Sequence, residues 1–225
     1  MLVGLGRAVA VALVVLAAGC GVEGETSAPP STAPGAGASA GVDAAMSEDE
    51  QTAVQATDAF WRRHFSELFG RPYHSPRVVG GYRGRSGPRC SGEASVPFNA
   101  FYCPAGDFLA WDEDLMSAGY QRVGDAWVYL IIAHEWGHAI QAQLDRDQVS
   151  VAAELQADCL AGATLQGAVE DRSIKLEPGD SEELAQTLVK VADDFPWTKE
   201  SDHGDAQQRI GAFNKGAQGG VNACV

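Results

Sequence analysis

The chain has 225 residues, of which 45% are hydrophobic and 20% charged, and this balance fits one folded domain and argues against a disordered chain. Acidic residues outnumber Lys and Arg by 30 to 16, which gives a formal net charge of −14. A nucleic-acid binder needs clustered cations to neutralise phosphates, and seven of the sixteen basic residues lie between Arg62 and Arg89, in a stretch interrupted by Pro and Gly. The composition therefore argues against nucleic acid as a partner.

The first twenty residues have the pattern of an export signal. An apolar run from Ala8 to Leu16 follows Arg7; it is shorter than the roughly 20 residues that span a bilayer but typical of a signal peptide. The run ends in Leu-Ala-Ala-Gly-Cys20, which resembles the bacterial lipoprotein signal box. We therefore expect a signal peptide over residues 1–19, a lipid on Cys20, and export to the extracytoplasmic face of the cell membrane. Ordinary cleavage nearby, with Cys20 incidental, is the alternative.

The segment after Cys20 has the composition of a tether. Ala, Gly, Ser, Thr and Pro dominate residues 23–45, and such a stretch buries too little apolar surface to offset its conformational entropy. We predict a disordered tether over residues 20–46 and one folded domain over residues 47–225.

Four cysteines remain beyond Cys20, and an even number in an exported chain suggests two disulfides. Cys90 and Cys103 lie on either side of a predicted turn, so the expected pairs are Cys90–Cys103 and Cys159–Cys224. A zinc site made of cysteines is the alternative, but no Cys-x-x-Cys spacing supports it.

Hydrophobic periodicity predicts a mainly helical α+β domain. The first helix is expected to run from a Ser47–Glu50 capping box to Gly70 and the second from an N-cap at Asp125 through Ile140. A third is expected from Val151 to Val169. The last two are expected from Asp180, with Glu183 at N3, through Val191, and from an Asp205/Gln208 capping box to Gly216. Residues 71–93 are expected to be irregular. Strands over 96–102 and 108–111 are expected to form a hairpin and hence a small antiparallel sheet.

The apolar helix predicted to begin after Asp125 carries the pattern His134-Glu135-Trp136-Gly137-His138. Residues four apart lie one turn apart on a helix, so both imidazoles can reach one ion. Glu135 adjoins that face and can take a proton from a metal-bound water. Burying these polar side chains without partners would be costly. The pattern predicts one zinc ion per chain.

A catalytic zinc needs a third protein ligand. Gln141 and Leu144 stand where a metzincin would have Gly and His. Glu154 and Asp158 lie on the next predicted helix, one turn apart on one face. One carboxylate can bind the metal while the other accepts the free N–H of a ligand histidine, and the spacing leaves the assignment open.

At this point the sequence resembles the thermolysin-like gluzincins, whose Glu-x-x-x-Asp helix supplies first the ligand and then its partner. The resemblance implies that Glu154 is the third ligand and that Asp158 orients a ligand histidine; the reverse assignment is the alternative. Asn99-Ala100-Phe101 likewise resembles the substrate-facing edge strand of these enzymes. It implies that the Asn99 side chain and the Ala100 carbonyl hold an extended peptide; a hairpin strand without a substrate role is the alternative.

Several blocks together resemble the bacterial putative neutral zinc metallopeptidases. They are Phe101–Pro104, Ala133–His138, Glu154–Cys159, His203-Gly204 and Gln208-Arg209. The resemblance covers about residues 98–213 and implies a zincin-like (minimal gluzincin) domain with a peptidase site. Many members begin with a long membrane helix, which the lipoprotein-like signal and tether replace here.

His203 is a further candidate for the site. A histidine outside the zinc motif stabilises the oxyanion in thermolysin-like enzymes, and the resemblance implies this role for His203. Asp202 or Asp205 is expected to orient it, and Arg209 is a second candidate for the same task.

The predicted function is that of a zinc metalloendopeptidase acting on polypeptides. Glu135 takes the proton from the attacking water and returns it to the leaving amine. One alternative is a zinc-binding envelope lipoprotein that acts as a scaffold or chaperone, although binding alone does not need Glu135. The other is a zinc amidase acting on cell-wall peptides, although the strand around Asn99 favours an extended polypeptide.

Overall fold

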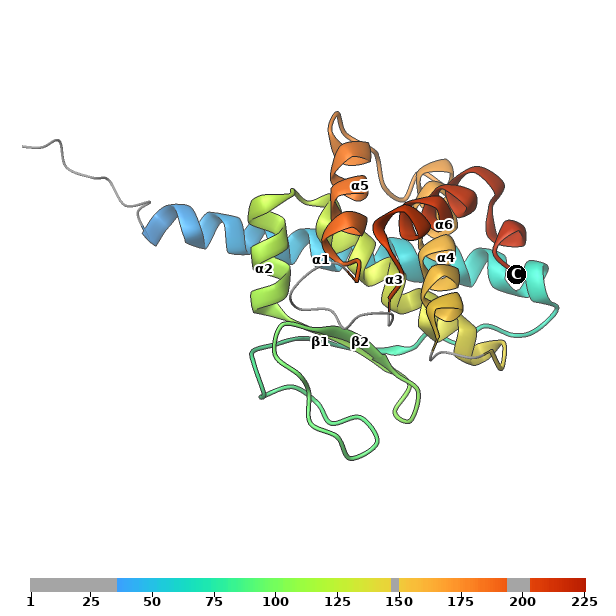
Figure 1. Cartoon of the computed structure of the whole chain (residues 1–225), viewed down its shortest axis with the longest axis horizontal. Helices are drawn as coiled ribbons and strands as arrows, with labels where there is room; N and C mark the ends of the chain where they lie inside the picture. The colour runs from blue at the N-terminus through green and yellow to red at the C-terminus, as the bar shows by residue number, and fades with distance from the viewer. Residues whose placement is uncertain (1–35, 147–149, 194–202) are drawn as a thin grey trace, which may run out of the picture. The chain divides into compact units, whose positions relative to one another are not determined.

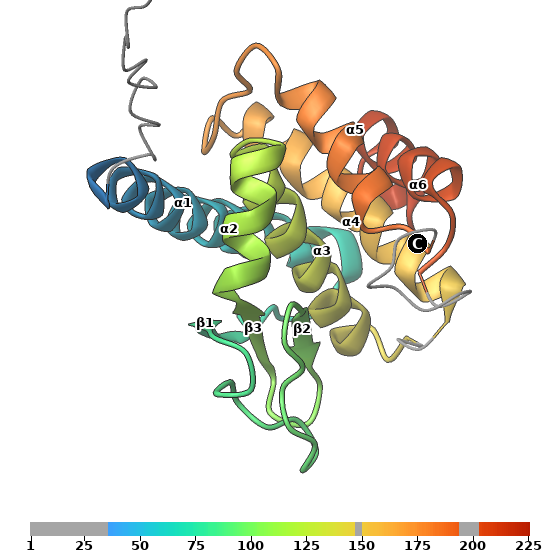
Figure 2. The ribbon, with the colours of Figure 1, turned by 60° about the vertical axis from the view of Figure 1, so that its left-hand side comes forward.

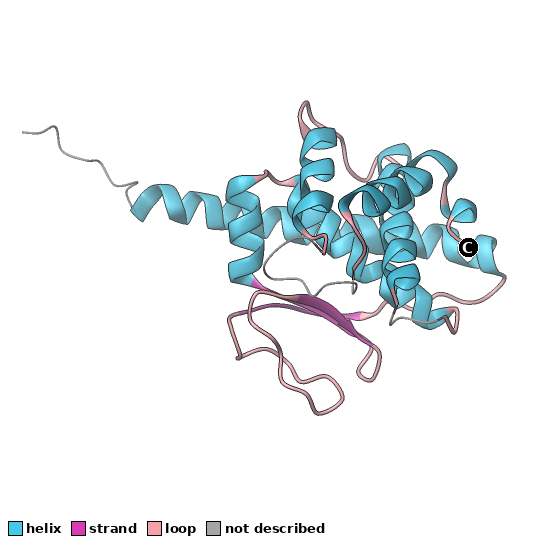
Figure 3. Ribbon diagram, in the orientation of Figure 1, coloured by secondary structure: helices cyan, strands magenta, loops and turns pink. Residues whose placement is uncertain are grey.

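The computed structural model describes residues 36–146, 150–193 and 203–225. All of them belong to the unit formed by residues 34–225, and Figure 1 shows their helices and strands coloured along the chain. In chain order the elements are α1 (Ala36–Phe69), β1 (Arg77–Tyr82), β2 (Ala100–Cys103), β3 (Phe108–Asp112), α2 (Glu113–Arg122), α3 (Ala126–Gln143), α4 (Val151–Glu170), α5 (Asp180–Lys190), α6 (Ala206–Gly219) and a 3₁₀ turn, η1 (Val221–Ala223). The domain is mainly helical with one small sheet (Figure 3), which confirms the predicted α+β class.

The sheet has the strand order β1-β3-β2. β2 and β3 pair antiparallel as the predicted hairpin, with Ala100 opposite Trp111, but β2 begins at Ala100, so residues 96–99 of the predicted strand lie outside it. β1 pairs parallel to β3. Residues 71–93 are therefore not wholly irregular, contrary to the expectation, and the sheet is mixed instead of antiparallel. Gly80, at φ +82°, lies at an irregularity in β1. The two glycines of β1 weaken the strand signal in the sequence.

α3 is the central helix of the domain, as predicted, and it contacts α1, α2, α4, α5 and β2 (Figure 2). Its buried apolar side chains lie on all sides: Trp127, Val128, Leu130, Ile132, Trp136 and Ile140. Fully burying one such side chain contributes about 1.5–3 kcal/mol. Asp125 is the N-cap residue, as predicted, but its side chain makes no capping hydrogen bond. Glu183 of α5 accepts a hydrogen bond from the Ala126 N–H instead (3.3 Å).

Two further helices differ from the predictions. α1 begins at Ala36, so Ser47 lies inside it and residues 36–46, expected as the end of the tether, are helical. Alanine favours helices, and Met46 is buried in the core. α1 ends as predicted, with Gly70 at φ +63°. α2 was not predicted; its N-cap is Asp112, whose side chain accepts from the Asp114 N–H.

Small residues allow α4 to pack closely against both α3 and α6. A Cβ on Gly137 would lie 2.9 Å from the Ala157 carbonyl oxygen, and one on Gly216 would lie 1.8 Å from the Cys159 carbonyl oxygen. The disulfide Cys159–Cys224 fastens the end of the chain to α4, and Cys90–Cys103 fastens a loop to β2. Both predicted pairs are confirmed.

Among the described residues, no helix has the length and apolar character needed to cross a membrane. Cys20 and the predicted boundary after residue 19 lie outside the described residues.

Glu50 is a buried carboxylate of α1, and one of its oxygens has no hydrogen-bond partner. Burial and the nearby negative charge of Glu113 raise its pKa to about 7. The folded protein therefore holds a proton that the unfolded chain releases near pH 4.5, so the free energy of unfolding should fall as the pH rises from about 4.5 to 7.

We predict that Glu50→Gln stabilises the protein by about 1–2 kcal/mol at pH 8, because it removes a buried charge, and changes little at pH 4. Urea unfolding of the variant at both pH values measures this difference. Glu48→Gln, on the exposed side of the same helix, is the matched control. A Glu50→Gln variant that is less stable than the wild type at pH 8 would contradict the prediction.

Candidate metal centre

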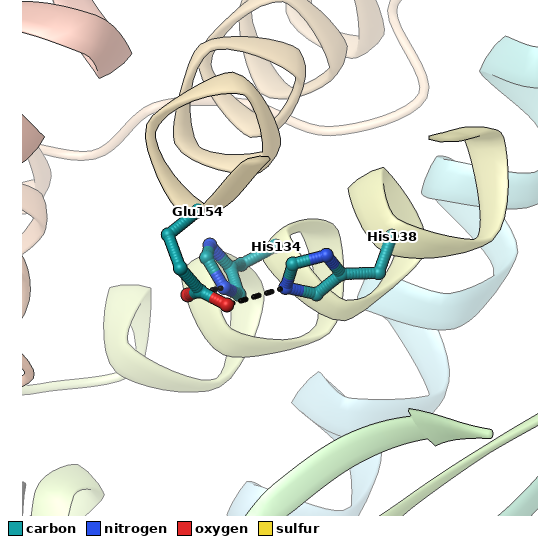
Figure 4. Close-up of side chains that lie close together, drawn as sticks. All are labelled: His134, His138 and Glu154. Atoms are coloured by element: carbon teal, nitrogen blue, oxygen red, sulfur yellow. Dashed lines mark ion pairs between the residues drawn. The ribbon is translucent and has the colours of Figure 1, made fainter. Parts of the chain in front are cut away.

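Three side chains from two helices converge at the centre of the domain. His134 and His138 extend from α3 and Glu154 from α4 (Figure 4). The Nε2 atom of His134 lies 3.3 Å from Glu154 Oε2, and that of His138 lies 3.4 Å from Glu154 Oε1. One ligand atom from each residue lies within 4.8 Å of the others. The two histidines share a face because they are one turn apart, and the close approach at Gly137 brings α4 to them.

The opposite nitrogen of each imidazole contacts an oxygen atom. His134 Nδ1 lies 2.8 Å from Asp158 Oδ1, and His138 Nδ1 lies 2.8 Å from Gln141 Oε1. Both oxygens are acceptors, so each Nδ1 donates a hydrogen to its oxygen, and a neutral ring that binds a metal would offer its Nε2 lone pair on the side of Glu154. Two imidazole nitrogens and one carboxylate form the ligand set of a catalytic zinc site. The residues present therefore fit zinc.

Charge and burial set the electrostatics of these three residues. Burial would lower the pKa of His134, but the carboxylates of Asp158 and Glu154 raise it to about 10. Burial would raise the pKa of Glu154, but hydrogen bonds from His134, His138 and His203 hold it well below its usual range. Without metal, a proton on His134 therefore balances the Glu154 carboxylate. A dication that binds there must displace that proton.

Asp158 connects His134, a candidate ligand, to α6. Its side chain is 0% exposed, and Arg209, at 3%, donates to it twice, from Nε to Oδ2 and from Nη2 to Oδ1, each at 2.8 Å. Burial would raise the pKa of Asp158, whereas Arg209 and His134 lower it. Arg209 also donates to the Val191 carbonyl at 2.5 Å. This two-point pair keeps the Asp158 carboxylate ionised and directed at His134.

Gln141 is a buried contact of the site that the sequence analysis did not assign. Besides its contact with His138, its Nε2 donates to the Ala153 carbonyl (2.6 Å) and to Gln156 Oε1 (3.2 Å). The sequence signal was its position three residues after His138 on a helix. In the sequence alone, Gln141 marks only a position at which the metzincin pattern is absent.

Glu135 lies on the neighbouring face of α3, between the helix and the sheet. Its Oε2 accepts a hydrogen bond from the Tyr102 N–H of β2 at 2.9 Å. Glu135 and His134 line one cavity of about 100 Å³, together with Phe98, Asn99, Ala100, Leu115, Ile131, Val191, His203 and Arg209. The structure therefore brings the predicted substrate-binding pair, Asn99 and Ala100, to the same cavity as the predicted base.

Phe98 adopts an unusual backbone conformation at the edge of this cavity. Its φ is +59°, which costs a bulky residue roughly 1–3 kcal/mol, and its side chain is 40% exposed. The buried Asp112 side chain accepts from the Phe98 N–H (2.6 Å). The Tyr82 hydroxyl donates to the carbonyls of Val96 and Asn99. These contacts hold the turn before β2 in place.

His203 reaches the centre from the segment before α6. Its Nδ1 lies 3.2 Å from Glu154 Oε2. The Asp193 carboxylate accepts from the N–H groups of His203 (2.8 Å) and Gly204 (2.9 Å). The expectation that Asp205 orients His203 was wrong, because Asp205 forms a capping box with Gln208 at the start of α6. The other expected partner, Asp202, lies outside the described residues.

We predict that Gln141→Leu lowers the affinity for zinc by about 10- to 100-fold, because His138 loses the acceptor that fixes its ring. Competition with a fluorescent zinc chelator measures the affinity. Gln143→Leu, on the same helix but in contact with the His74 backbone, is the matched control. Equal zinc affinity in the Gln141→Leu variant and the wild type would contradict this role.

Comparison with known proteins gives a family for the chain. The family described as "Putative neutral zinc metallopeptidase" matches residues 2–225. "Uncharacterized protein YpfJ" from Escherichia coli strain K12, and the protein of the same name from E. coli O6:H1 strain CFT073, are each 29% identical over 194 residues. These matches cover 74% of this chain and 66% of each relative. No solved structure gives a significant match. The family match spans nearly the whole chain and agrees with the resemblance of the His134–His138 region, so the chain belongs to the putative neutral zinc metallopeptidase family.

Proposed function

We propose that this protein is a zinc-dependent endopeptidase in which His134, His138 and Glu154 hold the metal and Glu135 acts as general base. The observation that carries the proposal is the arrangement of both Nε2 atoms around the Glu154 carboxylate while both Nδ1 atoms contact acceptors. Zinc held there would polarise the substrate carbonyl and lower the pKa of its water to about 7.

The contacts of the two carboxylates favour Glu154 as the third ligand. Glu154 lies beside the Nε2 atoms of both histidines. Asp158 lies on the Nδ1 side of His134, and each of its oxygens accepts from Arg209. We assign Asp158 the role of orienting His134. Its negative charge also raises the basicity of the ring, which strengthens the bond to a metal.

Glu135 is placed to move a proton between the attacking water and the leaving amine. Its carboxylate lines the cavity beside His134, and the hydrogen bond from Tyr102 fixes one of its oxygens. A general base must lie within hydrogen-bond reach of the proton that it accepts. We infer that Glu135 would reach a water bound in this cavity, because its carboxylate lines the cavity beside His134.

β2 is the strand to which we assign the substrate. It is an edge strand, and the Tyr102 N–H points away from β3, towards Glu135. N–H and C=O groups of alternate residues point the same way along a strand, so the Ala100 backbone also faces outwards. An extended peptide can pair with this edge by strand addition, and the Asn99 side chain is placed at the start of that edge.

His203 is our candidate for stabilising negative charge on the substrate carbonyl oxygen. Its imidazole lies beside Glu154 and lines the cavity, while Asp193 holds its backbone. Arg209 is less suited to this task, because Asp158 and the Val191 carbonyl engage its guanidinium.

We predict that Glu135→Gln retains zinc but loses hydrolysis of a mixed peptide library by about 10²- to 10⁴-fold, because the amide cannot accept the proton. Mass spectrometry of the products and elemental analysis of the same preparation measure the two properties. Glu154→Gln is the contrasting variant and should lose zinc, since a neutral amide is a poor ligand. Wild-type hydrolysis by the Glu135→Gln variant would refute the mechanism, and a zinc-loaded wild type that cleaves no peptide would favour a binding role.

We also propose that the protein is exported and anchored to the cell membrane by a lipid on Cys20. The support is the apolar run that ends in Leu-Ala-Ala-Gly-Cys20. Acyl chains contribute about 0.8 kcal/mol per buried CH₂ group, so two or more chains anchor a protein stably.

We predict that Cys20→Ala moves the protein from the detergent phase to the aqueous phase in detergent partitioning, because it removes the site of lipid attachment. Val22→Ala leaves the signal box intact and serves as the control. Detection of an unmodified Cys20 in the mature wild-type protein by mass spectrometry would overturn the proposed anchor.

A further inference from the structure

A line of hydrogen bonds leads from the ligand His138 to the end of the chain. His138 Nδ1 lies 2.8 Å from Gln141 Oε1, and Gln141 Nε2 donates to Gln156 Oε1 at 3.2 Å. Gln156 Nε2 in turn donates to the Cys224 carbonyl oxygen at 2.8 Å. Each amide accepts through its oxygen and donates through its nitrogen, so all the bonds point in one direction and polarise one another.

Two backbone carbonyls fix the orientation of these amides. A carbonyl can only accept, so the Cys224 carbonyl selects the NH₂ group of Gln156 and turns its oxygen towards Gln141. The Ala153 carbonyl selects the NH₂ group of Gln141 in the same way and turns its oxygen towards His138. A reversed amide would place a donor against the His138 Nδ1–H. The orientation of the two amides thus decides whether Nε2 of His138 is available to a metal.

The position of the Cys224 carbonyl depends on contacts with α4 and α6. The disulfide Cys159–Cys224 ties Cys224 to α4. The backbone N–H of Cys224 donates a hydrogen bond to the Val221 carbonyl within the turn that η1 forms. Val221 is buried in the core, and η1 contacts both α4 and α6. The carbonyl is therefore held on the same helix, α4, that carries Glu154.

We propose that Gln156 and the disulfide-held Cys224 carbonyl are positioning groups for the ligand His138, so that the end of the chain contributes to the affinity for zinc. This inference rests on the proposed metal site. Gln141 keeps its bond to Ala153 when Gln156 is removed. Loss of Gln156 should therefore lower the affinity for zinc by about 3- to 10-fold, less than the 10- to 100-fold expected for a direct partner of a ligand histidine.

The test compares zinc affinity and stability in the full-length chain, by chelator competition and by urea unfolding of the metal-free protein. Gln156→Leu and the double variant Cys159→Ser/Cys224→Ser should each weaken zinc binding by about 3- to 10-fold. Gln166→Leu, on the same helix but in contact with Glu170, and Cys90→Ser/Cys103→Ser are the matched controls. Both pairs of cysteine substitutions should lower stability, but only Cys159→Ser/Cys224→Ser should lower the affinity for zinc.

A double-mutant cycle tests whether Gln156 acts through Gln141. If it does, Gln156→Leu changes the affinity for zinc in the wild-type background and has no further effect in a Gln141→Leu background. Unchanged affinity in the Gln156→Leu variant, additive losses in the cycle, or equal losses for the two pairs of cysteine substitutions would overturn the inference. A wild-type chain that binds no zinc would instead overturn the proposed function itself.

Discussion

The buried carboxylate of Asp158 is the contact on which the rest of the site depends. It accepts from His134 of α3 and from Arg209 of α6 while its own backbone belongs to α4, so one side chain fixes three helices relative to one another. Removal of Arg209 would leave this buried carboxylate without its charge partner, which typically costs about 3–5 kcal/mol. The close packing at Gly137 and Gly216 brings the helices near enough for these short contacts. The fold and the site therefore rest on the same interaction.

The charges of Glu154, Asp158 and Arg209 also suit the binding of a dication between the two histidines. Arg209 and Asp158 neutralise each other, which leaves Glu154 as the one negative ligand beside two neutral imidazoles. A zinc ion held by this set would retain a net positive charge, and that charge is what allows a metal to polarise a carbonyl and acidify water. If Arg209 were absent, the second carboxylate would offset the remaining positive charge. Arg209 thus serves the site through Asp158 as well as through the packing of α6.

The sequence predicted the parts of the molecule whose signals are local. The His134–His138 pattern, the periodic helices α3 and α4 and the Asp205 capping box each depend on residues within a few positions, and the structure contains all of them. Two of the misses depend on distant contacts: β1 forms through pairing with β3, and the start of α3 is satisfied by Glu183 from another helix. Asp193 becomes visible as a partner of His203 only after the chain has folded, whereas Gln141, three residues after His138 on α3, had a local signal.

Glu135 directly follows His134, and this explains how one helix can supply both the metal ligands and the general base of the proposed reaction. Consecutive residues on an α-helix point about 100° apart, so when the histidines face α4, Glu135 turns towards β2. The Tyr102 N–H on the edge of that strand then fixes the carboxylate, and the Ala100 backbone faces the same side. The pitch of α3 and the pairing of β2 with β3 therefore position the proposed metal ligands, the proposed base and the proposed substrate-binding strand. In the proposed mechanism the small sheet supplies a strand edge for the peptide, which a helix bundle alone would not offer.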